Sequence, residues 1–135
     1  MYELKISEKQ AEVINLACEV FFRIGLGQVD LALELVWMDR IFGMDKDHPV
    51  DREEFRRSCD GLKKMITGHG PQASFGVGSK DVPSKSHVAV DIHQVIRHRL
   101  YWDKHKDDPN RTYTVNAGAP MKYSEEALPD IKKVS

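Results

Sequence analysis

The residue types best suited to chemistry gather in one stretch, residues 86–106, which reads SHVAVDIHQVIRHRLYWDKHK. An α-helix has about 3.6 residues per turn, so two neighbouring rows of this stretch carry imidazole, guanidinium and phenol groups on one flank. Guanidinium groups bind phosphate through paired hydrogen bonds, and aromatic rings stack on bases or sugars. The pattern predicts a binding site for a small phosphorylated ligand, made by these residues: Arg97, Arg99, His93, His98, Tyr101, Gln94 and, from a separate glycine-containing turn, Arg23.

The same flank also has a simpler interpretation. A basic side of an exposed helix is commonly solvated and paired with nearby acids, and Asp103 lies four residues after Arg99. The interleaving of aromatic with basic groups favours the ligand, and both interpretations stay open at this point.

Patterns for catalysis or metal binding are weak in this sequence. His93 and His98 are five residues apart and point in different directions on a helix, whereas a helical zinc pair has a spacing of four. Neither Cys18 nor Cys59 is flanked by a base that would activate its thiol. We therefore expect no metal, no cofactor and no enzymatic activity. A histidine-dependent phosphodiesterase or nuclease is the third interpretation, because histidines titrate near neutral pH.

The elements that position these residues are mainly helical. In the stretch 86–106 the apolar residues recur at spacings of three and four, which predicts a helix that faces the core. Ser7 with Gln10 makes a capping-box pattern, and Gly25 and Gly27 end the helix that follows. Residues 28–38 predict a second helix.

A further helix is expected after Asp51, which repeats the capping pattern with Glu54. Its predicted buried stripe consists of Phe55, Cys59, Leu62 and either Met65 or Ile66. Residues 67–85 hold four glycines and two prolines and predict a loop, which either is solvated or folds over the following helix as a lid.

Two short alternating stretches, 2–6 and 111–116, predict strands that pair with each other. Residues 117–135 have little pattern, and an extended C-terminal tail is expected there. The prediction is one compact domain over 1–135 of the α+β class, mainly helical, in which three or four packed helices meet a small sheet from the terminal strands.

The run LALELVWM is too apolar for a surface helix with a single buried side. We expect Leu33, Trp37 and Met38 to lie in an interface, either between copies of a homo-oligomer or with a host protein. Burial within the monomer is the equally favoured alternative, because an uncovered apolar patch promotes aggregation.

The overall composition restricts the class of protein. With 135 residues, a formal net charge of −1 and 30% charged residues, the chain lacks the basic excess that general nucleic-acid binding needs. Two cysteines in apolar patterns predict reduced thiols. No apolar run reaches the roughly 18 residues of a membrane span, and the N-terminus does not have the pattern of a signal peptide. A cytoplasmic protein that does not bind membranes is expected.

Four segments carry a resemblance: YELKISEKQAEVINLA near the start, RIGLGQ at 23–28, DIHQVIRHRLYWD at 91–103 and PMKYSEEALPDI at 120–131. In these the chain resembles a group of small, largely uncharacterised proteins encoded by tailed bacteriophages and prophages. The resemblance implies the cytoplasm of an infected bacterium and a role in countering host defence. Some phage proteins of this size sequester cyclic nucleotide immune signals in oligomeric, helix-rich pockets.

Two functions of different kinds follow from these patterns. The first is a non-enzymatic phage accessory protein that binds a cyclic nucleotide immune signal or a similar phosphorylated ligand. The second is a protein-interaction module that inhibits a host defence enzyme through its apolar surface.

Overall fold

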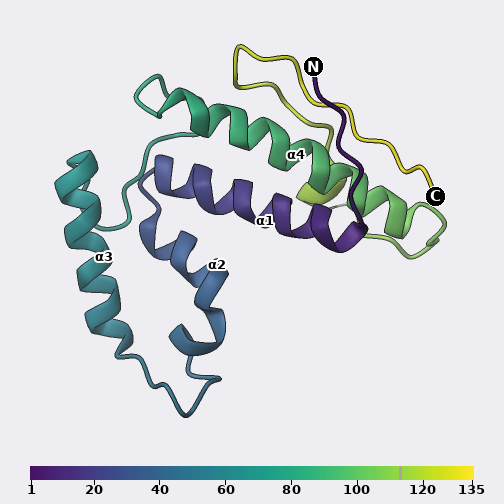
Figure 1. Ribbon diagram of the computed structural model, residues 1–135. Coiled ribbons are helices and arrows are strands. Elements are labelled where there is room, and N and C mark those ends of the chain that lie inside the picture. Colours follow the sequence, from purple (N-terminus) through teal and green to yellow (C-terminus); the bar gives the residue numbers. More distant parts are fainter. Residues whose placement is uncertain (113) are drawn as a thin grey trace.

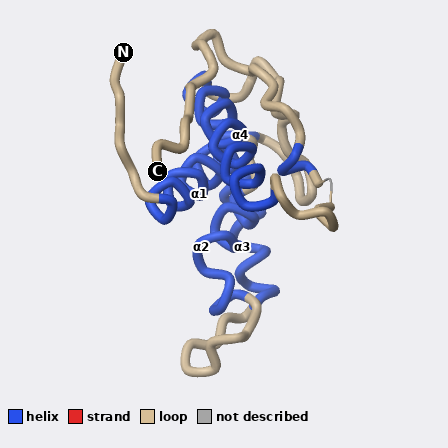
Figure 2. Tube along the Cα trace, turned by 90° about the vertical axis from the view of Figure 1, so that its right-hand side faces the viewer, coloured by secondary structure: helices blue, strands red, loops and turns tan. Residues whose placement is uncertain are grey.

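The computed structural model describes residues 1–112 and 114–135 (Figure 1). Within them the chain forms four α-helices and one short 3-10 helix, η1. The two long helices α1 and α4 lie side by side, α2 packs against α1, and α3 packs against α2 (Figures 1 and 2). The predicted packing of three or four helices is confirmed. The bounds are α1 Glu8–Gly25, α2 Val29–Ile41, α3 Arg52–Thr67, α4 Ser84–His105 and η1 Val115–Ala117.

The start of α1 is determined by local sequence. Ser7 accepts a hydrogen bond from the backbone N–H of Gln10 at 3.2 Å, and the Ser7 N–H donates to the Gln10 side chain at 2.8 Å. These two bonds satisfy backbone groups that a helix N-terminus otherwise leaves unpaired. The predicted capping box is confirmed.

The two glycines at the end of α1 serve different purposes. Gly27 has a φ of +84°, the left-handed conformation that glycine adopts without steric cost. Gly25 is the last residue of α1, and a Cβ atom there would lie 2.0 Å from the hydroxyl oxygen of Ser86 on α4. The missing side chain at Gly25 therefore lets the two long helices approach closely.

Helix α3 begins as predicted but buries a different face. The Asp51 side chain accepts hydrogen bonds from the backbone N–H groups of Glu53 and Glu54, each at 3.1 Å. The buried residues of α3 are Cys59 and Lys63. The prediction that Leu62, Met65 and Ile66 complete the buried stripe is wrong, because all three are exposed. Within 1–112 and 114–135, α2 is the only helix in contact with α3, so most of the apolar α3 stripe stays uncovered there.

The core joins α1 to α4 and also takes side chains from the segment between α3 and α4. Phe75 and Val77 pack against the buried cluster, and the Phe75 N–H donates to the Leu26 carbonyl oxygen at 2.9 Å. Tyr123 from the C-terminal segment packs there as well. The buried members of the cluster are Phe22, Leu26, Val82, Ala89 and Val90.

The predicted sheet is wrong, since no strand occurs in the described residues. Residues 2–6 form no strand, and Tyr2 and Leu4 are exposed. Of the second predicted strand, 111–116, residue 113 lies outside the described residues, and the chain from Val115 to Ala117 forms η1. Carbonyl oxygens of the described segment after α4 accept hydrogen bonds from side chains of α4. This segment therefore packs against a helix and does not pair with a strand.

None of the helices in 1–112 and 114–135 combines the length and apolar character that crossing a membrane requires.

Candidate functional site

One flank of α4 holds the C-terminal segment of the same chain. The side chain of Gln94 donates to the Met121 carbonyl oxygen at 3.0 Å and accepts from the Met121 N–H at 3.1 Å. His98 donates from Nδ1 to the Gly118 carbonyl oxygen at 2.9 Å. These contacts are made to backbone atoms, so they hold an extended segment largely independently of its side chains.

The same flank continues towards the end of α4. The Tyr101 hydroxyl donates to the Thr112 carbonyl oxygen, and Trp102 donates from Nε1 to the Ala117 carbonyl oxygen at 3.2 Å. Of the residues predicted to bind a ligand, Gln94, His98 and Tyr101 therefore contact the protein's own backbone.

Asp91 is a residue of this flank that the sequence analysis did not single out. It is 2% exposed and accepts hydrogen bonds from the Tyr123 N–H at 2.8 Å and the Ser124 N–H at 3.0 Å. The signal was present in the sequence, because an aspartate three residues before Gln94 and seven before His98 lies on the same side of a helix.

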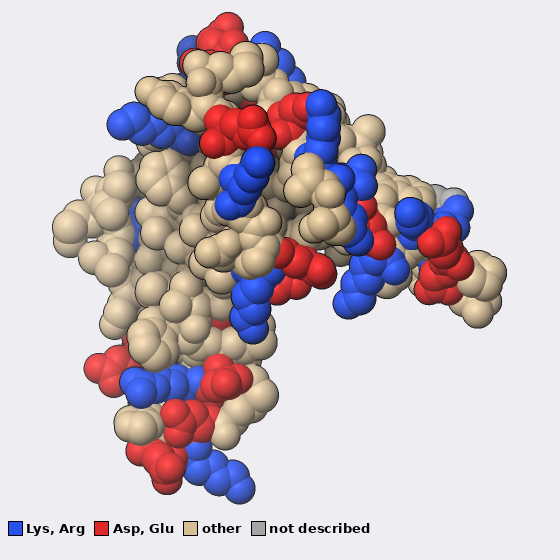
Figure 3. Space-filling view, turned by 45° about the vertical axis from the view of Figure 1, so that its right-hand side comes forward, with Lys and Arg blue, Asp and Glu red and all other residues tan. Residues whose placement is uncertain are grey.

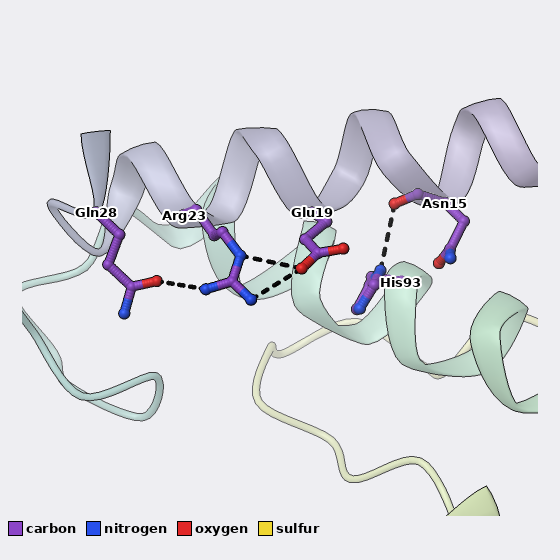
Figure 4. Close-up of polar contacts among 5 residues, drawn as sticks. All are labelled: Asn15, Glu19, Arg23, Gln28 and His93. Carbon is purple, nitrogen blue, oxygen red and sulfur yellow. Dashed lines mark hydrogen bonds and ion pairs between the residues drawn. The ribbon is translucent and has the colours of Figure 1, made fainter. Parts of the chain in front are cut away.

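His93 faces the opposite way, into the contact between α4 and α1 (Figure 4). It is 4% exposed, donates from Nδ1 to the Asn15 carbonyl oxygen at 3.2 Å, and packs edge-on against the Phe22 ring at 5.3 Å. Burial lowers the pKa of His93, because the charged imidazolium loses its hydration. The neutral ring is therefore a buried structural contact.

Arg23 lies beside this contact on α1, engaged by its neighbours (Figure 4). Its guanidinium donates to Glu19 at 3.0 and 2.8 Å and to the Gln28 side chain at 2.7 Å. The Gln28 amide donates in turn to the Ser74 hydroxyl at 3.4 Å. A line of polar contacts thus runs from α1 through the α1–α2 turn to the segment before α4.

Arg97 belongs to the same neighbourhood. Burial is the largest cause that lowers the pKa of His93, the hydrogen bond to Asn15 and the charge of Glu19 raise it, and the charges of Arg97 and Arg23 lower it further. Among the described residues no hydrogen bond is made by the Arg97 guanidinium, whose Nε is buried. The charges of Arg23 and Arg97 therefore both act on His93, and these are three of the seven residues predicted to bind a ligand.

Arg99 lies apart from that group, in an ion pair. It donates to the carboxylate of Asp103 on the next turn, with an Nε to Oδ2 distance of 3.1 Å. This ion pair is the one that the simpler interpretation of the basic flank predicts.

The predicted interface residues lie on an uncovered part of α2. Trp37 is 51% exposed, and Leu33 and Met38 are exposed as well. The alternative prediction, burial of this run within the monomer, is wrong for these three residues, although Ala32 in the same run is buried. The backbone at Trp37 leaves the helical conformation (φ −116°, ψ 33°), which kinks α2.

Two cation–π pairs flank this surface. The guanidinium carbon of Arg40 lies 4.9 Å from the centre of the Trp37 ring, and that of Arg52 lies 4.8 Å from the centre of the Phe42 ring. The Arg40 guanidinium thus packs on the Trp37 ring, while about half of Trp37 stays exposed to solvent.

A second apolar area runs along the contact between α1 and α4. It is a shallow groove of about 390 Å³, lined mainly by Ile14, Ala17, Phe21, Val88 and Ile92. Figure 3 shows charged side chains at the top, right and lower end of one face of the molecule, with a broad uncharged area beside them. The chain therefore presents apolar surface on two sides of α1, through α2 and through this groove.

Comparison with protein-family models, with curated proteins and with solved structures finds no match to this chain. The resemblance to proteins of tailed bacteriophages stays a prediction.

Proposed function

We propose that this chain is a non-enzymatic protein-interaction module that binds a host defence enzyme through α2. The observation that carries the proposal is the exposure of Trp37 beside Arg40. Tryptophan and arginine are the residue types that most often dominate the binding energy of protein interfaces. Leu33 and Met38, also exposed, supply the apolar area around them.

This proposal also fixes the chemistry of the partner surface. It requires an apolar cleft that accepts the Trp37 indole, with a carboxylate at its rim for the Arg40 guanidinium. Arg40 is available for such a contact, because its intramolecular ion pair with Asp45 is long, at 3.7 Å. The phage context remains part of the proposal, and it makes the partner an enzyme of the infected cell.

The test is a photo-crosslinking amino acid placed at Val36, an exposed neighbour of Trp37. In the bacterial host it should give one discrete adduct with an enzyme, and Trp37→Ala should remove that adduct. The purified enzyme should then be inhibited by the wild-type chain, with affinity falling about thirtyfold for Trp37→Ala, the size of a strong interface contact. Met65→Ala, at an equally apolar exposed site on α3, is the control and should bind as the wild type does.

Three outcomes would contradict the proposal: no adduct, an adduct with a second copy of the chain only, or a captured enzyme whose activity the chain does not change. The second of these would instead establish α2 as the contact of a homo-oligomer.

A second candidate function is binding of a small phosphorylated ligand, such as a cyclic nucleotide immune signal. The observation that favours it is that the charges of Arg23 and Arg97 both act on His93, while no described residue makes a hydrogen bond to the Arg97 guanidinium. Native mass spectrometry with a cyclic dinucleotide should then give an adduct that Arg97→Gln abolishes. Arg99→Gln is the matched control, because Arg99 pairs with Asp103. A wild-type chain without adduct, or equal loss in both variants, would reject this candidate.

A further inference from the structure

A hollow of about 530 Å³ lies between α2, α3 and the segment 71–74. Its size falls within the range of roughly 300–1,000 Å³ that small-molecule sites occupy. The lining combines five charged residues with neutral hydrogen-bonding groups, among them Gln28 and Ser74. The charged residues are Asp30, Glu34, Arg56, Asp60 and Lys63.

Lys63 is the unusual residue of this lining. It is only 6% exposed, yet its ammonium group makes no ion pair with any described residue. Lysine is almost never enclosed to this degree unless it is paired, and here the Nζ atom keeps contact with solvent. The aliphatic stem runs beside the α1–α2 turn, where its Cδ would lie 3.8 Å from a Cβ atom on Gly27. An anionic group in the hollow would supply the missing partner.

The carboxylates of the hollow are also without cationic partners. Asp30, Glu34 and Asp60 make no ion pair within the described residues. The negative charges of all three influence Cys59, a buried residue of α3. Burial is the main cause that raises the pKa of the Cys59 thiol, and these three charges raise it further. All three carboxylates line the same hollow as Lys63.

We propose that this hollow binds a small zwitterion that carries more amine than acid, of the class of free diamino carboxylic acids. Three carboxylates against Lys63 and Arg56 leave the lining with a net charge of −1, which a ligand of net charge +1 neutralises. The ligand's carboxylate lies against the Lys63 ammonium, and its amines lie among Asp30, Glu34 and Asp60. Gln28 and Ser74 add neutral hydrogen bonds. This site is separate from the exposed Trp37 surface and does not depend on the proposed function.

The test is an amide NMR titration of the full chain with three probes: L-lysine, cadaverine and glutarate. Cadaverine has the amines without the carboxylate, and glutarate has carboxylates without an amine. L-lysine should give saturable shifts at the amides of Gln28, Gln72 and Ser74. Its dissociation constant should be about tenfold lower than that of either other probe, because only L-lysine satisfies both sets of charges.

Two variants of adjacent lysines separate the site from general charge effects. Lys63→Met keeps the apolar stem and removes the ammonium, so the affinity for L-lysine should fall to that for cadaverine. Lys64→Met changes the exposed neighbour on α3 and should bind as the wild type does. Thermal unfolding of both variants shows whether each is folded.

The proposal is overturned if none of the three probes saturates in the wild type, or if L-lysine and cadaverine bind the wild type equally. It is also overturned if a folded Lys63→Met retains the preference for L-lysine. If Lys63→Met does not fold, the dissociation constants of the three probes for the wild type still test the proposal.

Discussion

The buried carboxylate of Asp91 holds Ser124 twice, through the backbone N–H at 3.0 Å and through the hydroxyl at 2.6 Å. One Asp91 oxygen makes both of these bonds, and the other accepts from the Tyr123 N–H. Asp91 thus holds the part of the C-terminal segment from which Tyr123 packs against the core.

Replacing that carboxylate should destabilise the fold. Asp91→Ala leaves three donors without their acceptor in a buried place, and we expect a loss of about 2–4 kcal/mol in the free energy of unfolding. Urea denaturation measures it. Asp103→Ala is the control, because its ion pair with Arg99 is partly exposed and should contribute less than about 1 kcal/mol. Equal losses in the two variants would mean that Asp91 does not hold the C-terminal segment in solution.

The lowered pKa of His93 predicts that the protein loses stability in acid. Its folded-state value is lowered by burial, below the value of about 6.5 for an unfolded chain. The unfolded state therefore binds the proton more readily than the folded state. The contribution of neutral His93 to the free energy of unfolding is complete above about pH 6.5, and it decreases as the pH falls from there towards the lowered pKa. Unfolding free energies between about pH 8 and pH 5 should fall less steeply for His93→Gln than for the wild type. Parallel curves would contradict a buried neutral His93.

Two glycines in helices should respond in opposite ways to alanine. Gly25→Ala places a Cβ atom 2.0 Å from the Ser86 hydroxyl and 2.7 Å from its Cβ, so α1 and α4 must separate, at a cost of about 1–3 kcal/mol or more. Gly61→Ala meets nothing within 4 Å inside α3 and should stabilise the chain by about 0.5–1 kcal/mol. Thermal denaturation of both variants measures the difference. A neutral Gly25→Ala would show that the two helices are farther apart than described.

The two tryptophans should differ in their access to solvent. Trp37 is 51% exposed, whereas Trp102 is partly buried under η1 and donates to the Ala117 carbonyl oxygen. Acrylamide should quench Trp37, measured in Trp102→Phe, more strongly than it quenches Trp102, measured in Trp37→Phe. The reverse order would mean that a second copy of the chain already covers α2.

Local elements of this protein follow from nearby residues in the sequence. The Ser7–Gln10 capping box and the Asp51 cap bond groups only two or three residues apart, so a short stretch carries all the information that they need. For Trp37 the sequence left two predictions open, an interface or burial within the monomer. An apolar run shows only that burial is favourable, and not what provides it. Whether the monomer or a partner provides that burial depends on the rest of the chain.

The roles of His93 and Gln94 depended on tertiary structure. They are adjacent in sequence, yet one is buried against α1 and the other bonds to Met121. The period of a helix shows which residues share a face, but it does not show what covers that face. The same limit explains the absent sheet in the described residues, because an alternating stretch becomes a strand only where another strand pairs with it. The sequence by itself determined the helices, the caps of α1 and α3 and the grouping of residues on each face. The tertiary structure alone decided that α4 holds the C-terminal segment, that His93 contacts Asn15 and that Lys63 lines a hollow. Each of these depends on contacts between residues far apart in the chain.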